Sequence, residues 1–128
     1  MSPTLSIVTV VKDDPIGLTR TRDSLHDCHT HDVHEIEWII VDSSTDTDAV
    51  PRIVGNGAIK GNVHWVPPEG VYEAMNIGLE RATGDYVYFL NAGDRLRDPQ
   101  ALTTILDATK KDQPTWIYGQ VAFVSPDG

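Results

Sequence analysis

The sequence predicts an α/β fold in which helices flank a mostly parallel β-sheet. Three observations support this prediction: short apolar runs alternate with helix-like stretches, the first two runs are mainly apolar without a strict alternation of polar residues, and no internal repeat is present. A continuously apolar strand is typical of a parallel sheet, because helices cover both of its faces. Strands that alternate with helices also indicate βαβ crossovers, which place the strands parallel to one another.

The first predicted strand and helix occupy residues 5–28. The run LSIVTVV at 5–11 is rich in β-branched side chains, as expected of a strand buried on both faces. Asp14 followed by Pro15 is typical of a helix N-cap and first turn. The residues that then recur at helical spacing are Leu18, Thr21, Leu25 and Cys28.

Two further strands follow in the middle of the chain. The run IEWIIVD at 36–42 is a second buried strand that ends at a carboxylate, and NVHWV at 62–66 predicts a shorter one. A short helix is expected between them at 46–54, where Pro51 limits its extent. This order continues the alternation of strand and helix.

The second half of the chain predicts two helices around a fourth strand. The stretch 70–85 reads as a helix in which Gly84 occupies the place of a C-cap glycine, and YVYFLN at 86–91 is the strand. Asp98 is expected to be the N-cap of the next helix, and a final run at 115–124 suggests a last strand. The apolar positions at helical spacing are Met75, Leu79 and Ala82, then Leu102, Ile105 and Leu106.

Length and charge limit the classes of function. The chain has 128 residues, 40% hydrophobic and 23% charged, which fits one domain over residues 1–128. Its net charge of −9 argues against nucleic acid as a partner, because a broad nucleic-acid-binding surface needs clustered lysine and arginine. An acidic protein can still bind phosphate locally, through backbone N–H groups or a bound cation.

Cysteine content and hydropathy predict a cytoplasmic location. The one cysteine, Cys28, excludes an internal disulfide and fits a reducing compartment. The first apolar run is too short to span a membrane and lacks the basic flank and cleavage site of a signal peptide. A peripheral association with the membrane stays compatible with these features.

The segment HDCHTHDVHE at 26–35 is rich in side chains that can bind metals. Structural zinc sites usually show paired ligands at fixed short spacings, with the pairs separated by a dozen or more residues. This segment lacks that pairing, so we expect no structural zinc site among His26, Cys28, His29, His31 and His34.

Ligands of parallel sheets bind beyond the carboxyl ends of the strands. This rule selects the segments 9–13, 42–46 and 91–94. The first two contain clustered carboxylates, although Asp42 could also cap an ordinary turn with the serines that follow it. The third, NAGD, ends in one carboxylate and is either an altered metal site or a simple turn. Neither a G-x-G-x-x-G turn nor a P-loop is present, which argues against dinucleotides and P-loop chemistry.

Four motifs in order resemble the nucleotide-binding half of family 2 glycosyltransferases, which have the GT-A fold. They are LSIVTVVKDD, IEWIIVDSSTD, GVYEAMNIGLERATGDYVYFLNAGD and IYGQV, and they cover nearly the whole chain. Their wording is similar to the branch that makes bacterial surface or capsular polysaccharides. The resemblance implies a Rossmann-like GT-A domain that binds a nucleoside-diphosphate sugar, with a UDP-sugar favoured. The sugar would be transferred with inversion to a polysaccharide or another glycan or lipid-linked acceptor.

The resemblance also implies roles for individual residues. Thr9 and Asp42 match positions that hold the nucleobase and ribose, and Asn76 matches a position that faces the nucleotide sugar. Lys12 belongs to the same donor site but stands where the family usually has an aromatic residue. Stacking of the base on an aromatic ring at that position is therefore not expected.

The stretch NAGD falls on the metal motif of the family. Asn91 matches its first aspartate and Asp94 its last, and this wording is a variant found in the same branch. The amide of Asn91 can bond a ribose hydroxyl, whereas Asp94 offers the hard anionic oxygen that Mg²⁺ or Mn²⁺ prefers. We therefore expect a divalent cation at Asp94 that binds weakly without the oxygens of a diphosphate.

Inverting sugar transfer also needs a base that deprotonates the acceptor hydroxyl. In the family this carboxylate lies in the acceptor-binding half, so the domain would stop before that half and no catalytic residue is assigned within 1–128. We expect the chain to bind donor better than it transfers sugar, and to form homo-oligomers through exposed strand edges or apolar surface. The alternative is a non-catalytic module that binds nucleotide sugars or another partner.

Overall fold

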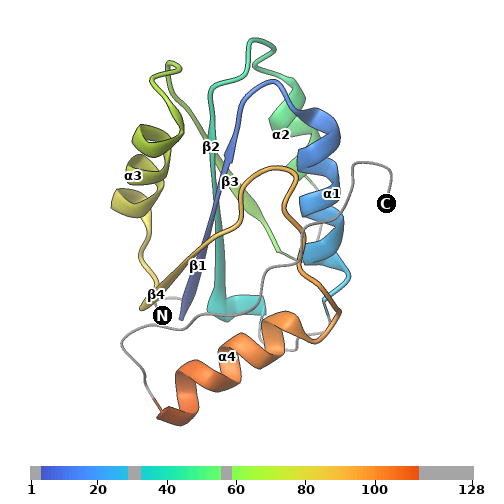
Figure 1. Cartoon of the computed structure of the whole chain (residues 1–128), viewed down its shortest axis with the longest axis vertical. Coiled ribbons are helices and arrows are strands. Elements are labelled where there is room, and N and C mark those ends of the chain that lie inside the picture. Colours follow the sequence, from blue (N-terminus) through green and yellow to red (C-terminus); the bar gives the residue numbers. More distant parts are fainter. Residues whose placement is uncertain (1–3, 29–32, 56–58, 113–128) are drawn as a thin grey trace.

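The computed structural model describes residues 4–28, 33–55 and 59–112. In this part of the chain four strands form one parallel sheet in the order β3-β2-β1-β4 (Figure 1). The parallel sheet confirms the predicted α/β class, while the run at 115–124 lies outside the described residues. The strands are β1 (Leu5–Val11), β2 (Ile36–Asp42), β3 (Gly61–Trp65) and β4 (Tyr86–Phe89).

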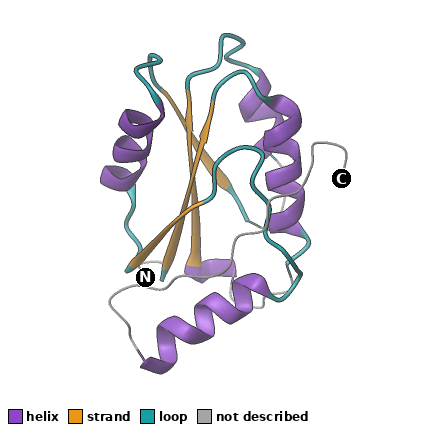
Figure 2. Cartoon of the chain, viewed as in Figure 1, coloured by secondary structure: helices purple, strands orange, loops and turns teal. Residues whose placement is uncertain are grey.

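Helices cover both faces of the sheet, as Figure 2 shows. Helices α1 and α2 pack on one face and α3 on the other, while α4 adds side chains to the core under α1. Each crossover returns the chain to the end of the sheet where the preceding strand began, so that all four strands run parallel. The helical elements are α1 (Pro15–His26), the 3₁₀ turn η1 (Val33–Glu35), α2 (Ala49–Val54), α3 (Val71–Arg81) and α4 (Ala101–Asp112).

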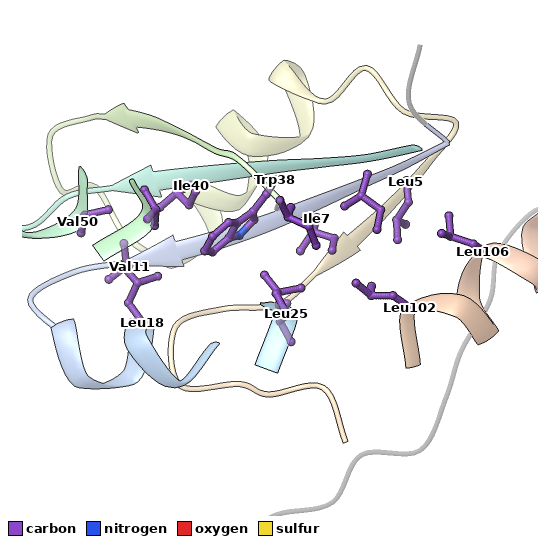
Figure 3. Close-up of a cluster of buried hydrophobic side chains, with 14 residues drawn as sticks. Leu5, Ile7, Val11, Leu18, Leu25, Trp38, Ile40, Val50, Leu102 and Leu106 are labelled. Atoms are coloured by element: carbon purple, nitrogen blue, oxygen red, sulfur yellow. The ribbon is translucent and has the colours of Figure 1, made fainter. Parts of the chain in front are cut away.

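Strand β1 supplies side chains to two separate hydrophobic clusters, because successive residues point to opposite faces. Leu5, Ile7 and Val11 face α1, whereas Val8 faces α3. The larger cluster surrounds the fully buried ring of Trp38 and gathers side chains from both central strands and from α1, α2 and α4 (Figure 3). The sheet is therefore buried on both faces where β1 and β2 run through it.

Helix α1 begins as the sequence predicts. The Asp14 side chain accepts a hydrogen bond of 2.9 Å from the backbone N–H of Gly17, which confirms it as the N-cap. Leu18, Thr21 and Leu25 are fully buried. The cap therefore stabilises the first turn of α1, and the buried side chains set the orientation of the helix on the sheet.

Helix α3 approaches the sheet most closely through small residues and not through the large side chains of the predicted stripe of Met75, Leu79 and Ala82. Ala74 and Gly78 are its buried residues, and the Leu79 side chain is 49% exposed. A Cβ added at Gly78 would collide with Cγ1 of Val8. The predicted stripe is therefore wrong at Leu79, whereas Ala82 packs against the core cluster together with Ile77.

Three predicted helix boundaries also differ. Helix α3 ends at Arg81 with Ala82 as an extended C-cap, and a Cβ at Gly84 would lie 2.9 Å from the backbone nitrogen of Ser6. Gly84 is therefore required by close packing and does not cap the helix. Helices α2 and α4 begin at residues 49 and 101, a few residues later than expected. Asp98 instead caps the turn before α4, where it accepts a 2.8 Å bond from the N–H of Gln100.

We predict that Gly78→Ala destabilises the protein by about 1 to 2 kcal/mol, because overpacking outweighs the better helix propensity of alanine. Urea unfolding followed by circular dichroism would measure this change as a lower midpoint. Asn76→Ala, on the exposed side of the same helix, is the matched control and should leave the midpoint unchanged or raise it slightly. Equal midpoints for the two variants would contradict the close approach of α3 to Val8.

Candidate functional site

A cavity of about 380 Å³ opens at the carboxyl ends of β1 and β4. The chain order β1, β2, β3 runs to one side of the sheet, and β4 is added on the other side of β1. The cavity therefore lies at the point where the strand order reverses, where open α/β sheets bind ligands. Its lining residues are Val10, Val11, Lys12, Asp14, Ser43, Pro68, Gly70, Val71, Ala74, Asn91 and Ala92.

The predicted NAGD segment forms a tight turn at this cavity. The Oδ1 atom of Asn91 accepts a 3.2 Å hydrogen bond from the N–H of Val10, and the N–H of Ala92 donates to the Val10 carbonyl at 3.1 Å. The pairing of β1 with β4 thus continues beyond the strand. The N–H of Asp94 then donates to the Asn91 carbonyl at 2.8 Å and closes a β-turn. Gly93, the third residue, has φ 97°, a conformation that favours glycine.

The Asp94 carboxylate is exposed at the end of this turn. Its Oδ2 atom accepts a 3.2 Å hydrogen bond from the N–H of Asn91, whereas no described group donates to its Oδ1. Burial and the nearby Asp94 carboxylate both raise the pKa of Tyr88 above its usual range. Asp94 thus stays partly free to accept a ligand.

The donor set at Asp94 fits a cation that shares its shell with a bound molecule. In residues 4–28, 33–55 and 59–112, no three His, Cys, Asp or Glu side chains are grouped so that they could hold a metal. One carboxylate alone is a weak site for Mg²⁺ or Mn²⁺, which take about six oxygen ligands. His29 and His31 of the histidine-rich segment lie outside the described residues.

Asp42 ends β2 as a buried carboxylate that is only 1% exposed. Its Oδ1 atom accepts a 2.8 Å hydrogen bond from the N–H of Ser44, so Asp42 does cap the turn that follows it. Its Oδ2 atom is buried and has no described hydrogen-bond partner. An unpaired buried carboxylate oxygen is costly, and a ligand that donates a hydrogen bond to it would remove this cost.

Thr9 lies in the core and not in the cavity lining. It is fully buried on the α1 side of β1, where its hydroxyl donates to the Leu90 carbonyl at 2.6 Å and accepts from Nε1 of Trp38 at 2.9 Å. These bonds leave no hydroxyl hydrogen for a ligand. The structure thus places Thr9 among the residues that hold the strands together.

The other predicted residues divide between the cavity and the surface. Lys12 and Asn91 line the cavity, and Asp42 directly precedes the lining residue Ser43. Asn76 is exposed on α3, two residues beyond Ala74 and therefore on the side of the helix that faces away from the sheet. The structure brings together residues from the ends of β1, β2 and β4 and leaves Asn76 outside this group.

Hydrogen bonds join the loop after β1 to the loop after β2, and we did not predict these contacts from the sequence. The Oδ1 atom of Asp13 accepts a 2.7 Å bond from the N–H of Thr45, and the Asp13 N–H donates to Oγ of Ser44 at 3.0 Å. Asp13 has φ 52°, which is unusual for a residue other than glycine. Asp14 also lines the cavity in addition to its role as N-cap. The sequence feature that could have indicated these contacts is the presence of acidic and hydroxyl residues directly after two adjacent parallel strands.

Sequence comparisons identify relatives that are longer than this chain. Residues 6–128 match the model of the family described as Glycosyl transferase family 2. An uncharacterized glycosyltransferase of Mycobacterium tuberculosis is 30% identical over 98% of this chain and 48% of that protein. A PGL/p-HBAD biosynthesis glycosyltransferase of Mycobacterium bovis is 32% identical over 68% of this chain and 36% of that protein. The chain thus spans about half the length of these relatives, or less.

Two solved structures share the fold and confirm its GT-A class. A mannosyltransferase from Pyrobaculum calidifontis, in complex with GDP-Man and Mn²⁺, has a TM-score of 0.74 and 19% identity over 88% of this chain and 34% of its own. S. aureus TarS 1–349 has a TM-score of 0.75 and 20% identity over 86% of this chain and 33% of its own. Among the described helices of this chain, none combines the length and apolar character needed to cross a bilayer.

We predict that Thr9→Val destabilises the protein by roughly 2 kcal/mol, because the buried Nε1–H of Trp38 and the carbonyl of Leu90 lose their shared partner. Thermal unfolding would show a lower midpoint, with a change in tryptophan fluorescence. Thr9→Ser keeps the hydroxyl and should lose less stability. A Thr9→Val protein as stable as the parent would show that the hydroxyl is not needed in the core.

Proposed function

The chain belongs to glycosyl transferase family 2, and on this basis we propose that the cavity binds the nucleoside diphosphate of a sugar donor. The observation that carries the proposal is that polar side chains from three adjacent strand ends meet at the point where the strand order reverses. The donor would serve inverting transfer of the sugar to a polysaccharide or glycolipid acceptor. A UDP-sugar is the first candidate, and the mannosyltransferase complex with GDP-Man makes a GDP-sugar the second.

The charges and free hydrogen-bonding groups match the parts of such a donor. The Asp42 carboxylate, whose buried Oδ2 has no described partner, would accept from an N–H of the base or a ribose hydroxyl once a small movement beside Ser43 exposes it. The Asn91 amide would donate to the ribose or diphosphate through its NH₂, since Oδ1 is bound to Val10 and no described group accepts from the NH₂. Lys12 lines the cavity and pairs with no described carboxylate, and its ammonium would bind diphosphate oxygens.

The cation would bind at Asp94. A divalent ion held there supplies positive charge that stabilises the leaving diphosphate. The Mn²⁺ of the mannosyltransferase complex supports this part of the proposal. Thr9 would support the site indirectly, through its hydrogen bond to the Leu90 carbonyl just after β4. The exposed Asn76 would contact neither the base nor the diphosphate in this arrangement.

We predict that the chain binds UDP or GDP more tightly with Mn²⁺ than without it. Asp94→Asn should weaken the Mn²⁺-dependent affinity about tenfold or more, which is roughly 1.4 kcal/mol, because the anionic ligand is lost. Isothermal titration calorimetry with each nucleotide, with and without Mn²⁺, measures this. Asp107→Asn, an exposed carboxylate on α4, is the matched control and should bind as the parent does.

Absence of binding for both nucleotides under every condition would defeat the donor-site proposal. The alternative of a binding module without chemistry predicts the same calorimetric result. It differs in that no sugar would be transferred to any added acceptor, whereas an enzyme would turn over the donor and lose this turnover in Asp94→Asn.

We further predict that Asn91→Asp tightens the binding of Mn²⁺ in the absence of nucleotide. An aspartate keeps an oxygen for the Val10 N–H and adds a second anionic ligand at the cavity. Titration of the free ion, followed by electron paramagnetic resonance, would measure the gain. Asn62→Asp, on the exposed edge strand β3, controls for the added negative charge. Equal affinities in the two variants would place the cation away from residue 91.

A further inference from the structure

One buried hydroxyl of α1 contacts the turn that carries Asp94. Thr21 is fully buried, and its Oγ1 atom lies 2.7 Å from the Asp94 carbonyl oxygen, 3.1 Å from the Gly93 amide nitrogen and 3.4 Å from the Asn91 carbonyl oxygen. A hydroxyl has one hydrogen to donate and two lone pairs to accept. It therefore donates to Asp94 and accepts from the Gly93 N–H at the same time.

The alternative partner within the helix is weaker. A threonine in a helix often bonds the carbonyl four residues earlier, and here the Gly17 carbonyl lies 3.2 Å from Oγ1 of Thr21. The Asp94 carbonyl is closer, at 2.7 Å, and Gly17 offers nothing to replace the bond from the Gly93 N–H. The hydroxyl is thus directed mainly to the turn, which lies 72 and 73 residues further along the chain.

A second hydroxyl extends this contact. Ser24, three residues after Thr21 on α1, donates to the Thr21 carbonyl at 2.9 Å and accepts from the Leu96 N–H at 3.1 Å. Helix α1 thus binds the backbone on both sides of the Asp94 carboxylate. Because α1 is itself fixed by its N-cap and by buried leucines, it gives the exposed turn a rigid support.

The two ends of the turn are held by different elements. Asn91 is tied to β1 through Val10, whereas Gly93 and Asp94 are tied to α1 through Thr21. Without Thr21, the hydrogen bonds between Asn91 and Asp94 would still close the turn locally. They would link the carboxylate to β1 only through Asn91, and the Gly93–Asp94 side of the turn would lose its own contact with α1.

We propose that Thr21 is a positioning residue of the donor site and that its hydroxyl sets the place of the Asp94 carboxylate for a divalent cation. This inference rests on the proposed function for its consequence, but its structural part can be tested without any ligand. Thr21 would touch neither donor nor cation, and would act only through the Gly93 and Asp94 backbone.

The test compares Thr21→Val, which keeps the shape and loses the hydroxyl, with Thr21→Ser, which keeps the hydroxyl. We expect Thr21→Val to speed amide hydrogen exchange at Gly93 at least tenfold and to weaken Mn²⁺-dependent nucleotide affinity about tenfold. Nucleotide affinity without metal should stay unchanged, and Thr21→Ser should restore both quantities. The control is Thr109→Val, which removes a buried hydroxyl that bonds within α4, to the Leu106 carbonyl.

The control separates positioning from a general loss of stability. Equal losses of metal-dependent affinity in Thr21→Val and Thr109→Val would overturn the proposal, as would Thr21→Val binding like the parent. A parent chain that binds no nucleotide under any condition would defeat the proposed function and this inference together. A parent that binds with Mn²⁺, and a Thr21→Val variant that binds equally well, would defeat the inference alone.

Discussion

The hydroxyl of Thr9 joins the three strand segments whose ends form the cavity. It connects β1 to Trp38 of β2 and to the Leu90 carbonyl just after β4, inside the buried core. A buried hydroxyl that lost either partner would leave a polar group unsatisfied, so these bonds favour one register of the sheet over its neighbours. Because the cavity lies at the ends of the same strands, its shape depends on this register.

The two faces of the sheet contribute to the site in different ways. On the α1 face, buried and partly buried hydroxyls of Thr9, Thr21 and Ser24 bind backbone groups between residues 90 and 96. On the opposite face, α3 packs closely through Ala74 and Gly78, so the first turn of α3 lies against the end of β1 and lines the cavity. Hydrogen bonds thus hold the wall of the cavity that follows β4. The small side chains of α3 let the other wall lie close to β1.

Much of the fold could be predicted from the sequence because long apolar runs and caps report on local structure. β1, β2 and the start of α1 follow from continuous hydrophobicity and from Asp14 before Pro15. The face of α3 that packs on the sheet could not be predicted from apolar runs or caps. A helix that approaches a sheet closely presents its smallest residues to it, and Gly78 counts as a poor helix former in any reading based on propensity.

The position of the cavity could be predicted from the sequence, whereas the side chains that line it could be predicted only in part. The rule that ligands bind at strand ends selected the segments that line the cavity, yet it does not say where each side chain points. Thr9 lies on the same α1 face as Leu5 and Ile7, because side chains two residues apart in a strand point the same way. The sequence of β1 therefore already indicated that Thr9 is buried. Thr21 carried no local signal, since its partners are more than seventy residues away in the chain. Contacts of that kind follow from topology and not from sequence spacing.

The hydrogen bonds of the NAGD turn explain how an amide can stand where an acid is expected. Val10, Thr21 and the turn itself hold the segment through bonds that need no cation, so Asn91 has a structural role that an uncharged side chain fulfils. A carboxylate there would place another negative charge beside Asp94 and near Asp14, in a chain whose net charge is already −9. Like charges at such short range disfavour the folded state until a cation neutralises them. An amide at position 91 therefore keeps the turn stable without a cation, and in the proposed donor site the diphosphate would complete the shell of the cation.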